Sequence, residues 1–177
     1  MKINVEAFTR DMERLALRFE SGNSFLDNFI KSDEAFDAGI GKTFVWIDEK
    51  RTKIIGYYNI GVGYIDTMTE AGKYKIGGSI HLNFFALTME YRGVIVDVKD
   101  DGTKIKVSDQ LFADFMSKVY MLREYYLGFS FVTLAATDEG YSLYKRNLFE
   151  DFEADLHFSL KEDEDNCRPM YLALDYE

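Results

Sequence analysis

Apolar residues gather along the chain in short runs separated by polar turns, a pattern that predicts strands before helices. Residues 42–48 and 53–60 are two such runs, joined by a polar turn at residues 48–51, and they predict an antiparallel hairpin. Residues 80–89 are almost continuously apolar, as expected of a central strand covered on both faces. Residues 61–78 between them are rich in glycine, threonine, lysine and tyrosine and predict a loop.

Helical spacing is clearest in two places. Residues 5–30 mix short helical patterns with turn signals at residues 21–23, and the apolar spacing after Ser24 predicts that this serine caps a helix. A longer helix is expected from Ser108 to about Tyr126, with Gly128 placed to end it. Its apolar stripe consists of Leu111, Phe115, Val119 and Leu122.

The segment between the central strand and the long helix has two readings. Residues 94–98 and 103–107 flank an Asp-Gly turn, so they form either a small extra hairpin or an ordered loop. Further along, the pattern predicts a strand at residues 129–134 and a helix at about 138–147. Two closing strands are expected near residues 149–160 and 170–176, joined by an acidic loop at 161–166. Hairpin strands followed by strand–helix–strand indicate a mixed α/β sheet with helices on both faces.

Composition supports a folded chain with its own core. The 177 residues suit a single domain spanning 1–177, and 47% are hydrophobic, including 15 Phe and 12 Tyr. The net charge of −10 opposes nonspecific binding to a nucleic-acid backbone, although a local basic patch could exist.

Cysteine and histidine are too few for several kinds of chemistry. Cys167 is alone, so it has no partner within the chain for a disulfide. His81 and His157 are isolated, so no metal site and no nucleophilic triad is expected. The first residues lack a signal-peptide core and no apolar run could span a bilayer, so a soluble, cytoplasmic protein is expected.

Four local patterns, in the right order, resemble the GNAT-type N-acetyltransferases and their toxin-like subgroup. Residues 19–30 are similar to an N-terminal Phe-x-x-Gly-x-x-x-Leu-x-x-Phe segment, and residues 42–47 with 55–58 to the first hairpin. Residues 143–150 resemble a Leu-Tyr-x-Arg-x-Gly-Phe-Glu signature, and residues 170–172 the closing strand. The resemblance covers nearly the whole chain and implies a central mixed, mostly antiparallel sheet flanked by helices.

The resemblance also implies an activity, the transfer of acetyl from acetyl-CoA to a primary amine by direct attack in a ternary complex. Tyr144 would then be the general acid that protonates the departing thiolate, with Tyr141 as a substitute one turn earlier. Glu90 would relay a proton from the amine, unless it is only a solvated carboxylate. The alternative for Tyr144 is a core aromatic on an amphipathic helix.

The same resemblance assigns the cofactor site. The strand residues Phe85, Ala86 and Leu87 would offer backbone groups to the acetyl and pantetheine parts of acetyl-CoA. Phosphate contacts would come from Arg92, Gly93, Lys104, Lys106 and Ser108.

The sequence departs from the family pattern at four points. Ile95 stands where a second glycine is expected, and roughly a dozen residues intervene before Ser108. Asp109, near the helix start, would compete with a phosphate, and Leu148 replaces the glycine of the later signature.

The acceptor is left open by the sequence. An amine-bearing small molecule or a protein amine suits the acidic chain, whereas the toxin-like segments favour aminoacyl-tRNA. A GNAT-fold interaction module without cofactor binding is the alternative from another class. A homodimer is permitted but not required, and no membrane partner is expected.

Overall fold

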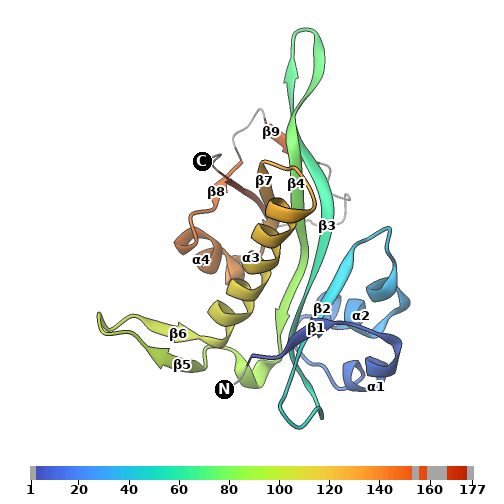
Figure 1. Ribbon diagram of the computed structural model, residues 1–177, viewed down its shortest axis with the longest axis vertical. Coiled ribbons are helices and arrows are strands. Elements are labelled where there is room, and N and C mark those ends of the chain that lie inside the picture. Colours follow the sequence, from blue (N-terminus) through green and yellow to red (C-terminus); the bar gives the residue numbers. More distant parts are fainter. Residues whose placement is uncertain (1–2, 153–155, 159–166, 175–177) are drawn as a thin grey trace. The chain divides into compact units, whose positions relative to one another are not determined.

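The computed structural model describes residues 3–152, 156–158 and 167–174, and the chain divides into two compact units (Figure 1). The first unit contains Met1–Ile60 and Asn83–Lys118, and the second contains Gly61–Leu82 and Val119–Glu177. The helices are α1 (Glu13–Ala16), α2 (Ser24–Lys31), α3 (Val107–Tyr125) and α4 (Asp138–Arg146), with 3₁₀ turns η1 (Arg10–Met12), η2 (Asp33–Phe36) and η3 (Met89–Tyr91). The strands are β1 (Val5–Ala7), β2 (Lys42–Ile47), β3 (Ile54–Thr69), β4 (Gly72–Leu87), β5 (Ile95–Val98), β6 (Lys104–Lys106), β7 (Phe131–Ala136), β8 (Glu150–Asp151), β9 (Leu156–Phe158) and β10 (Arg168–Ala173).

The first unit is built on strands in the order β1-β2-β3-β4. The predicted hairpin is present, because β2 pairs antiparallel with β3 from Lys42 opposite Ile60 to Ile47 opposite Ile54. Strand β1 was not expected. It is only three residues long and pairs antiparallel with β2, with Val5 opposite Trp46. Such a short strand offers too few positions for an alternating pattern to stand out.

Short helices complete the core of this unit. Helix α2 begins at Ser24, and its cap is Asn23, whose side-chain oxygen accepts from the backbone N–H groups of Phe25 and Leu26. The prediction that Ser24 is the cap is therefore wrong by one residue. Both side chains can cap a helix, and the chain places the amide rather than the hydroxyl at that position. Phe29 and Ile30 of this helix are buried, as their spacing predicted.

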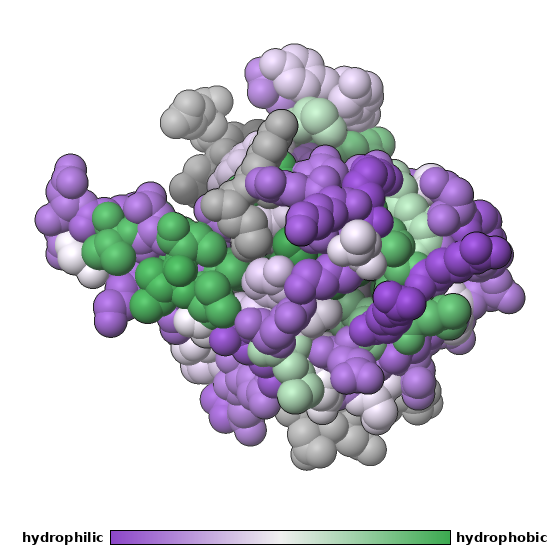
Figure 2. All heavy atoms as spheres, turned by 90° about the horizontal axis from the view of Figure 1, so that it is seen from below, coloured by the Kyte–Doolittle hydropathy of each residue, from purple (hydrophilic) through white to green (hydrophobic). Residues whose placement is uncertain are grey.

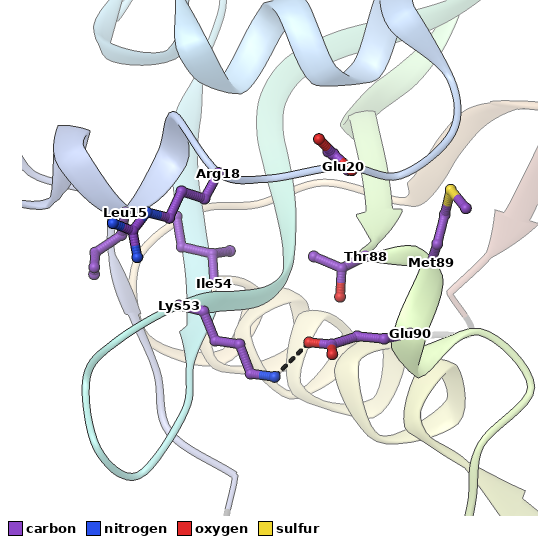
Figure 3. Close-up of a pocket in the computed structure, with 8 residues that line it drawn as sticks. All are labelled: Leu15, Arg18, Glu20, Lys53, Ile54, Thr88, Met89 and Glu90. Carbon is purple, nitrogen blue, oxygen red and sulfur yellow. Dashed lines mark hydrogen bonds and ion pairs between the residues drawn. The ribbon is translucent and has the colours of Figure 1, made fainter.

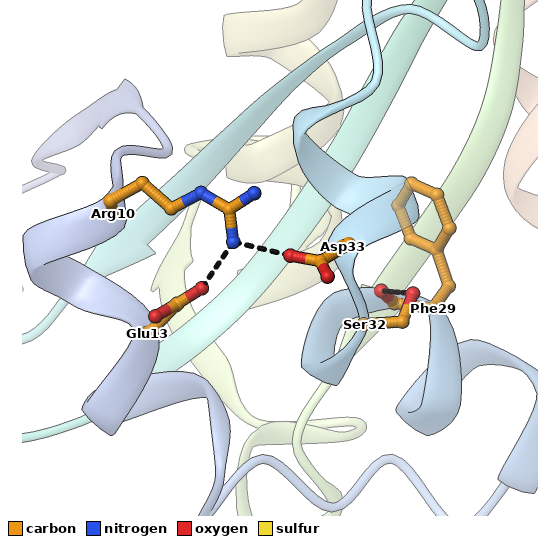
Figure 4. Close-up of polar contacts among 5 residues, drawn as sticks. All are labelled: Arg10, Glu13, Phe29, Ser32 and Asp33. Carbon is orange, nitrogen blue, oxygen red and sulfur yellow. Dashed lines mark hydrogen bonds and ion pairs between the residues drawn. The ribbon is translucent and has the colours of Figure 1, made fainter.

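An exposed arginine links the segments around this core (Figure 4). One guanidinium nitrogen of Arg10 lies 2.5 Å from carboxylate oxygens of both Glu13 and Asp33. The same guanidinium lies 4.0 Å from the centre of the Phe36 ring. Because these side chains are exposed, the contacts orient the segments more than they stabilise them.

Strands β3 and β4 are much longer than the sequence indicated. The loop expected at residues 61–78 is wrong, since β3 continues to Thr69 and β4 starts at Gly72. Two of the glycines that suggested a loop lie at close approaches: a Cβ on Gly63 would come 3.1 Å from Ser79 Oγ, and one on Gly77 would come 2.9 Å from the Phe131 ring. Glycine inside a strand marks such a contact as often as it marks a turn.

The second unit contains the one parallel pair among the strand pairs of the described residues. Strand β4 pairs parallel with β7 from Ser79 opposite Phe131 to Leu82 opposite Leu134. The other pairings in this unit, β7 with β10, β10 with β8, and β3 with β9, are antiparallel. The predicted fold class, a mixed and mostly antiparallel α/β sheet, is confirmed. The acidic loop expected at residues 161–166 lies outside the described residues.

The segment after β4 resolves the choice left open by the sequence. Strands β5 and β6 form an antiparallel hairpin, in which Val98 pairs with Lys104 and Gly102 turns at a φ of +81°. Figure 2 shows apolar side chains gathered over this hairpin, where Val94 and Ile95 are exposed. Helix α3 follows it directly. The helix ends at Tyr125, within one residue of the expected end near Tyr126, and the N–H groups of residues 126 and 127 both bond to the carbonyl of residue 122.

Candidate active site

Helix α4 presents Tyr144 inside the second unit. The helix begins at Asp138 behind Thr137, whose side-chain oxygen accepts from the backbone N–H of Gly140 at 3.2 Å. The Tyr144 side chain is 6% exposed, and its ring centre lies 6.0 Å from that of Phe149. Burial, and after it the nearby Cys167, raises the pKa of the Tyr144 phenol. The phenol therefore stays protonated at neutral pH and can donate a hydrogen bond or a proton.

The end of α4 fixes this ring pair. The N–H of Phe149 bonds to the carbonyl of Tyr144 at 3.1 Å, and the N–H of Leu148 bonds to the carbonyl of Lys145 at 3.1 Å. This is the Schellman pattern of helix ends, in which the residue at the left-handed position is usually glycine. Leu148 occupies that position at a φ of +68° and is 77% exposed. The replacement of the family glycine is thus accommodated without loss of the turn.

Gly140 is a site residue that sequence reasoning missed. A Cβ added to it would come 3.1 Å from Cε2 of Tyr144, so a larger residue here would press on the phenol ring. The available signal was the glycine itself, because glycine in a helix costs about 1 kcal/mol relative to alanine and so indicates a local reason.

Tyr141 does not present a free phenol. Its hydroxyl donates to Asp151 Oδ2 at 2.8 Å. The guanidinium of Arg168 lies 4.8 Å from the centre of its ring. These contacts hold Tyr141 in a polar surface cluster.

The predicted acyl-binding strand is the end of β4 in the first unit. Ala86 and Leu87 are buried there, and Phe85 makes an edge contact with Phe112. Gly56 of β3 allows this approach, since a Cβ at Gly56 would come 2.8 Å from the carbonyl oxygen of Ala86 and 2.5 Å from Leu87 Cδ2. Gly56 is therefore a second position whose role in the site was missed.

The extent of strand pairing is the feature of β4 that bears most on function. Its parallel pairing with β7 ends at Leu82 and Leu134, although the two strands continue to Leu87 and to Ala136. Backbone N–H and C=O groups beyond the last pair need other partners.

Glu90 lies just after β4, on η3, and forms an ion pair with Lys53. The hydrogen bonds that Lys53 donates to Glu90 and then to Tyr91 raise the pKa of Lys53. The Glu90 side chain is 56% exposed and lines a cavity of about 330 Å³ together with Thr88 and Met89 (Figure 3). Glu90 is therefore accessible to solvent, as the interpretation as a solvated carboxylate requires, but it is also paired with Lys53.

The predicted phosphate-binding residues are spread over the hairpin that separates β4 from α3. Arg92 and Gly93 are exposed, and Gly93 adopts a φ of +69° with open space around its Cα. Lys104 and Lys106 alternate on β6, and Ser108 lies in the first turn of α3. All five belong to the first unit, whereas Tyr144 belongs to the second.

The start of α3 already holds a carboxylate of this chain. Asp109 Oδ2 accepts from the backbone N–H of Lys106 at 2.8 Å. The expected competition between Asp109 and a phosphate therefore has a geometric basis, since the carboxylate uses one donor close to the helix start.

A half-buried histidine lies in the parallel ladder of the second unit. His81 Nδ1 is 2.8 Å from Thr133 Oγ1, and the Thr133 hydroxyl donates to Ser79 Oγ at 3.2 Å. Burial lowers the pKa of His81 to about 4, so its imidazole is neutral at pH 7. No group of His, Cys, Asp and Glu residues that could hold a metal ion occurs in the described part of the chain.

The chain was compared with families, with curated proteins and with solved structures. No protein-family model and no curated protein matches it. No helix among the described residues is long and apolar enough to cross a membrane.

Solved structures of bacterial toxins share the fold. The crystal structure of AtaTR bound with AcCoA aligns with a TM-score of 0.69 and 17% identity, over 97% of this chain and 93% of that chain. The KacTA–DNA complex aligns at 0.67 and 14%, over 97% and 93%. AtaT complexed with acetyl-methionyl-tRNAfMet aligns at 0.64 and 16%, over 95% and 94%. The chain therefore has the GNAT-like fold that its sequence resemblance predicts.

Proposed function

We propose that the chain is an acetyl-CoA-dependent N-acetyltransferase that transfers acetyl to a primary amine. The observation that carries the proposal is the early end of the β4–β7 ladder. The continuing backbone of β4 at Phe85, Ala86 and Leu87 can hydrogen-bond the acetyl carbonyl and the pantetheine amides. Fold likeness to a structure bound with AcCoA supports the choice of cosubstrate.

The proposed reaction is direct attack of a neutral amine on the thioester carbonyl. The new C–N bond forms as the C–S bond breaks, and the departing thiolate takes a proton from the Tyr144 phenol. The proton lost by the attacking nitrogen passes to Glu90 or to water. Orientation of both substrates supplies most of the acceleration, with the phenol adding general acid catalysis.

Arg92, Lys104 and Lys106 are proposed to contact the phosphates of CoA, with the backbone of Gly93 and Ser108 nearby. Their positions on an exposed hairpin and at a helix start are compatible with phosphate contact. Because Asp109 already accepts from a backbone N–H near the helix start, the proposed phosphate contacts depend mainly on the cationic side chains.

The proposed acceptor is an amine on a small molecule or a protein. A second candidate is aminoacyl-tRNA, which is favoured by the likeness to AtaT complexed with acetyl-methionyl-tRNAfMet. With a net charge of −10, binding of tRNA would depend on local patches and would weaken steeply with salt. A cytoplasmic location follows from the proposed cosubstrate.

The deciding experiment is calorimetric titration of the full chain with acetyl-CoA, followed by a transfer assay that detects free CoA. The acceptor panel should contain polyamines, a lysine-rich peptide and charged tRNA. Heat of binding together with CoA release on at least one acceptor supports the proposal. Absence of binding at saturating acetyl-CoA overturns it and leaves the interaction module as the function of the fold.

A further inference from the structure

The cavity beside Glu90 has a lining that none of the preceding arguments explains. It lies wholly in the first unit and has a volume of about 330 Å³, the lower end of the range for small-molecule sites. Leu15 and Ile54 supply apolar walls, and the Ile54 side chain is 1% exposed.

A buried hydroxyl is directed into this cavity. Thr88 is 8% exposed, and its Oγ1 has no hydrogen-bond partner among the described residues. Figure 3 shows this oxygen on the side of the cavity where Lys53 and Glu90 meet. An unpaired buried hydroxyl costs free energy unless something satisfies it, so the group points to a polar ligand.

The charges around the cavity come in balanced pairs. Lys53 and Glu90 form an ion pair, and Arg18 and Glu20 add one charge of each sign to the lining. Lys53 and Glu90 are 39% and 56% exposed, so each stays hydrated when they are separated, and a ligand with a single charge gains a contact with only one of them. A ligand that carries both charges can insert between them and give each side chain a new partner.

We propose that this cavity binds a free α-amino acid with an apolar side chain. Its carboxylate would face Lys53 and its ammonium Glu90, with the Thr88 hydroxyl able to bond to either group. The apolar side chain would lie against Leu15 and Ile54. This proposal goes beyond acetyl transfer and does not depend on it, because binding is tested without acetyl-CoA.

The experiment compares three ligands on the full chain by calorimetry or by amide chemical shifts. L-leucine carries both charges, isocaproate has the same skeleton without the amine, and isoamylamine lacks the carboxylate. We expect L-leucine to bind with a Kd on the order of 1 mM, as befits so small a ligand. The two analogues should bind about threefold to fivefold more weakly, since each can make only one of the two charged contacts.

A variant pair then tests the hydroxyl. Thr88→Val keeps the shape and removes the oxygen, and it should weaken L-leucine binding roughly fivefold to tenfold. Thr103→Val, at the exposed hairpin turn of the same unit, is the matched control and should leave binding unchanged. Equal affinity for the three ligands, no binding of L-leucine, or unchanged binding in folded Thr88→Val overturns the proposal. If circular dichroism shows Thr88→Val unfolded, the three-ligand comparison on the wild-type chain decides alone.

Discussion

Both units bury tyrosine and both contain a series of hydrogen-bonded polar side chains, but the partners of these groups differ between the units. In the first unit the Tyr58 hydroxyl donates to Asp114 Oδ2 at 2.5 Å, and Lys118 donates to the same oxygen at 2.6 Å. In the second unit the contact of Tyr144 that stands out is aromatic, with Phe149. Hydrogen bonding to a charged partner indicates a structural role for Tyr58, whereas the role proposed for Tyr144 is chemical.

The hydrogen-bonded polar side chains of the two units also differ, in whether they titrate. In the first unit, Asn83 Nδ2 donates to Asn59 Oδ1 at 2.6 Å, Asn59 Nδ2 donates to Thr43 Oγ1 at 2.9 Å, and the Thr43 hydroxyl donates to the carbonyl of Ala35 at 2.7 Å. None of these groups titrates near neutral pH. The second unit uses His81, with Thr133 and Ser79. Low pH should therefore weaken the hydrogen bonds around His81 in the second unit and leave the hydrogen bonds of Asn83, Asn59 and Thr43 in the first unit intact.

The largest effect is expected from Tyr144→Phe. If the phenol protonates the thiolate, the rate of acetyl transfer should fall by about 1,000-fold, within the range for loss of a general acid. The free energy of unfolding should change by less than about 1 kcal/mol, because the ring contact and the helix-end bonds remain. Steady-state assays and urea unfolding measure the two quantities. A variant that keeps full activity would remove Tyr144 from the mechanism.

Low pH should test the difference between the polar side chains of the two units, because only those of the second unit include a histidine. The pKa of His81 is lowered to about 4 by burial, while an unfolded histidine titrates near its ordinary value of 6.5. Between these values the unfolded chain binds more protons, so this stabilisation is complete above pH 6.5 and is lost as the pH falls toward 4. The loss should reach about 3 kcal/mol by pH 4.

Urea unfolding at several pH values measures this loss, and His81→Gln is the control. The variant lacks the histidine, so its free energy of unfolding should depend less on pH over the same window. The carboxylates that titrate there are common to both proteins and cancel in the comparison. If the two proteins lose stability in parallel, the histidine is not the cause.

The sequence predicted local features of both units well and non-local ones poorly. Helix α4 was predicted at about residues 138–147 from the local pattern and the signature around Tyr144, both read within a dozen positions. The lengths of β3 and β4 did not follow, because glycines such as Gly77 are required by a contact with Phe131, more than fifty positions away. A single sequence carries no mark of such a partner.

The candidate site shows the same division. Tyr144 and the end of β4 were proposed from short patterns, and the hairpin after Gly93 was one of the two structures that its Asp-Gly turn allowed. The ion pair between Glu90 and Lys53 joins segments that no local rule connects, as does the packing of Gly56 against Ala86. Contacts of this kind depend on the tertiary arrangement rather than on propensity.

Tyr58→Phe is the matched counterpart of the first substitution. It removes one of the two donors to Asp114 Oδ2, so the free energy of unfolding should fall by about 2 kcal/mol, as for a hydrogen bond to a charged group. Acetyl transfer should keep its rate at temperatures where the variant is folded. Burial, and after it Asp114, raises the pKa of the Tyr58 phenol, so the hydroxyl stays a donor throughout the working range. A loss of activity without loss of stability would reverse the assignment of the two tyrosines.

The smallest expected effect is a difference in stability between glycine substitutions at two strained backbone positions, one in each unit. Arg51 at a φ of +55° and Leu148 at +68° are the non-glycine residues with positive φ among the described residues. The Arg51 guanidinium lies 2.5 Å from Glu6 Oε1, so the side chain makes an ion pair that partly offsets the backbone strain. Leu148 is 77% exposed, and its left-handed turn could be made by glycine at no steric cost.

Leu148→Gly should therefore raise the free energy of unfolding by about 0.5–1 kcal/mol, the relief of left-handed strain less the greater chain entropy of glycine. Arg51→Gly relieves similar strain but loses the contact with Glu6, so no gain is expected. Thermal and urea unfolding of the two variants against the wild-type chain measure the difference. A destabilised Leu148→Gly variant would mean that the exposed leucine makes a stabilising contact that outweighs its backbone strain. The Schellman turn that holds Phe149 against Tyr144 would then depend on this leucine side chain as well as on its backbone.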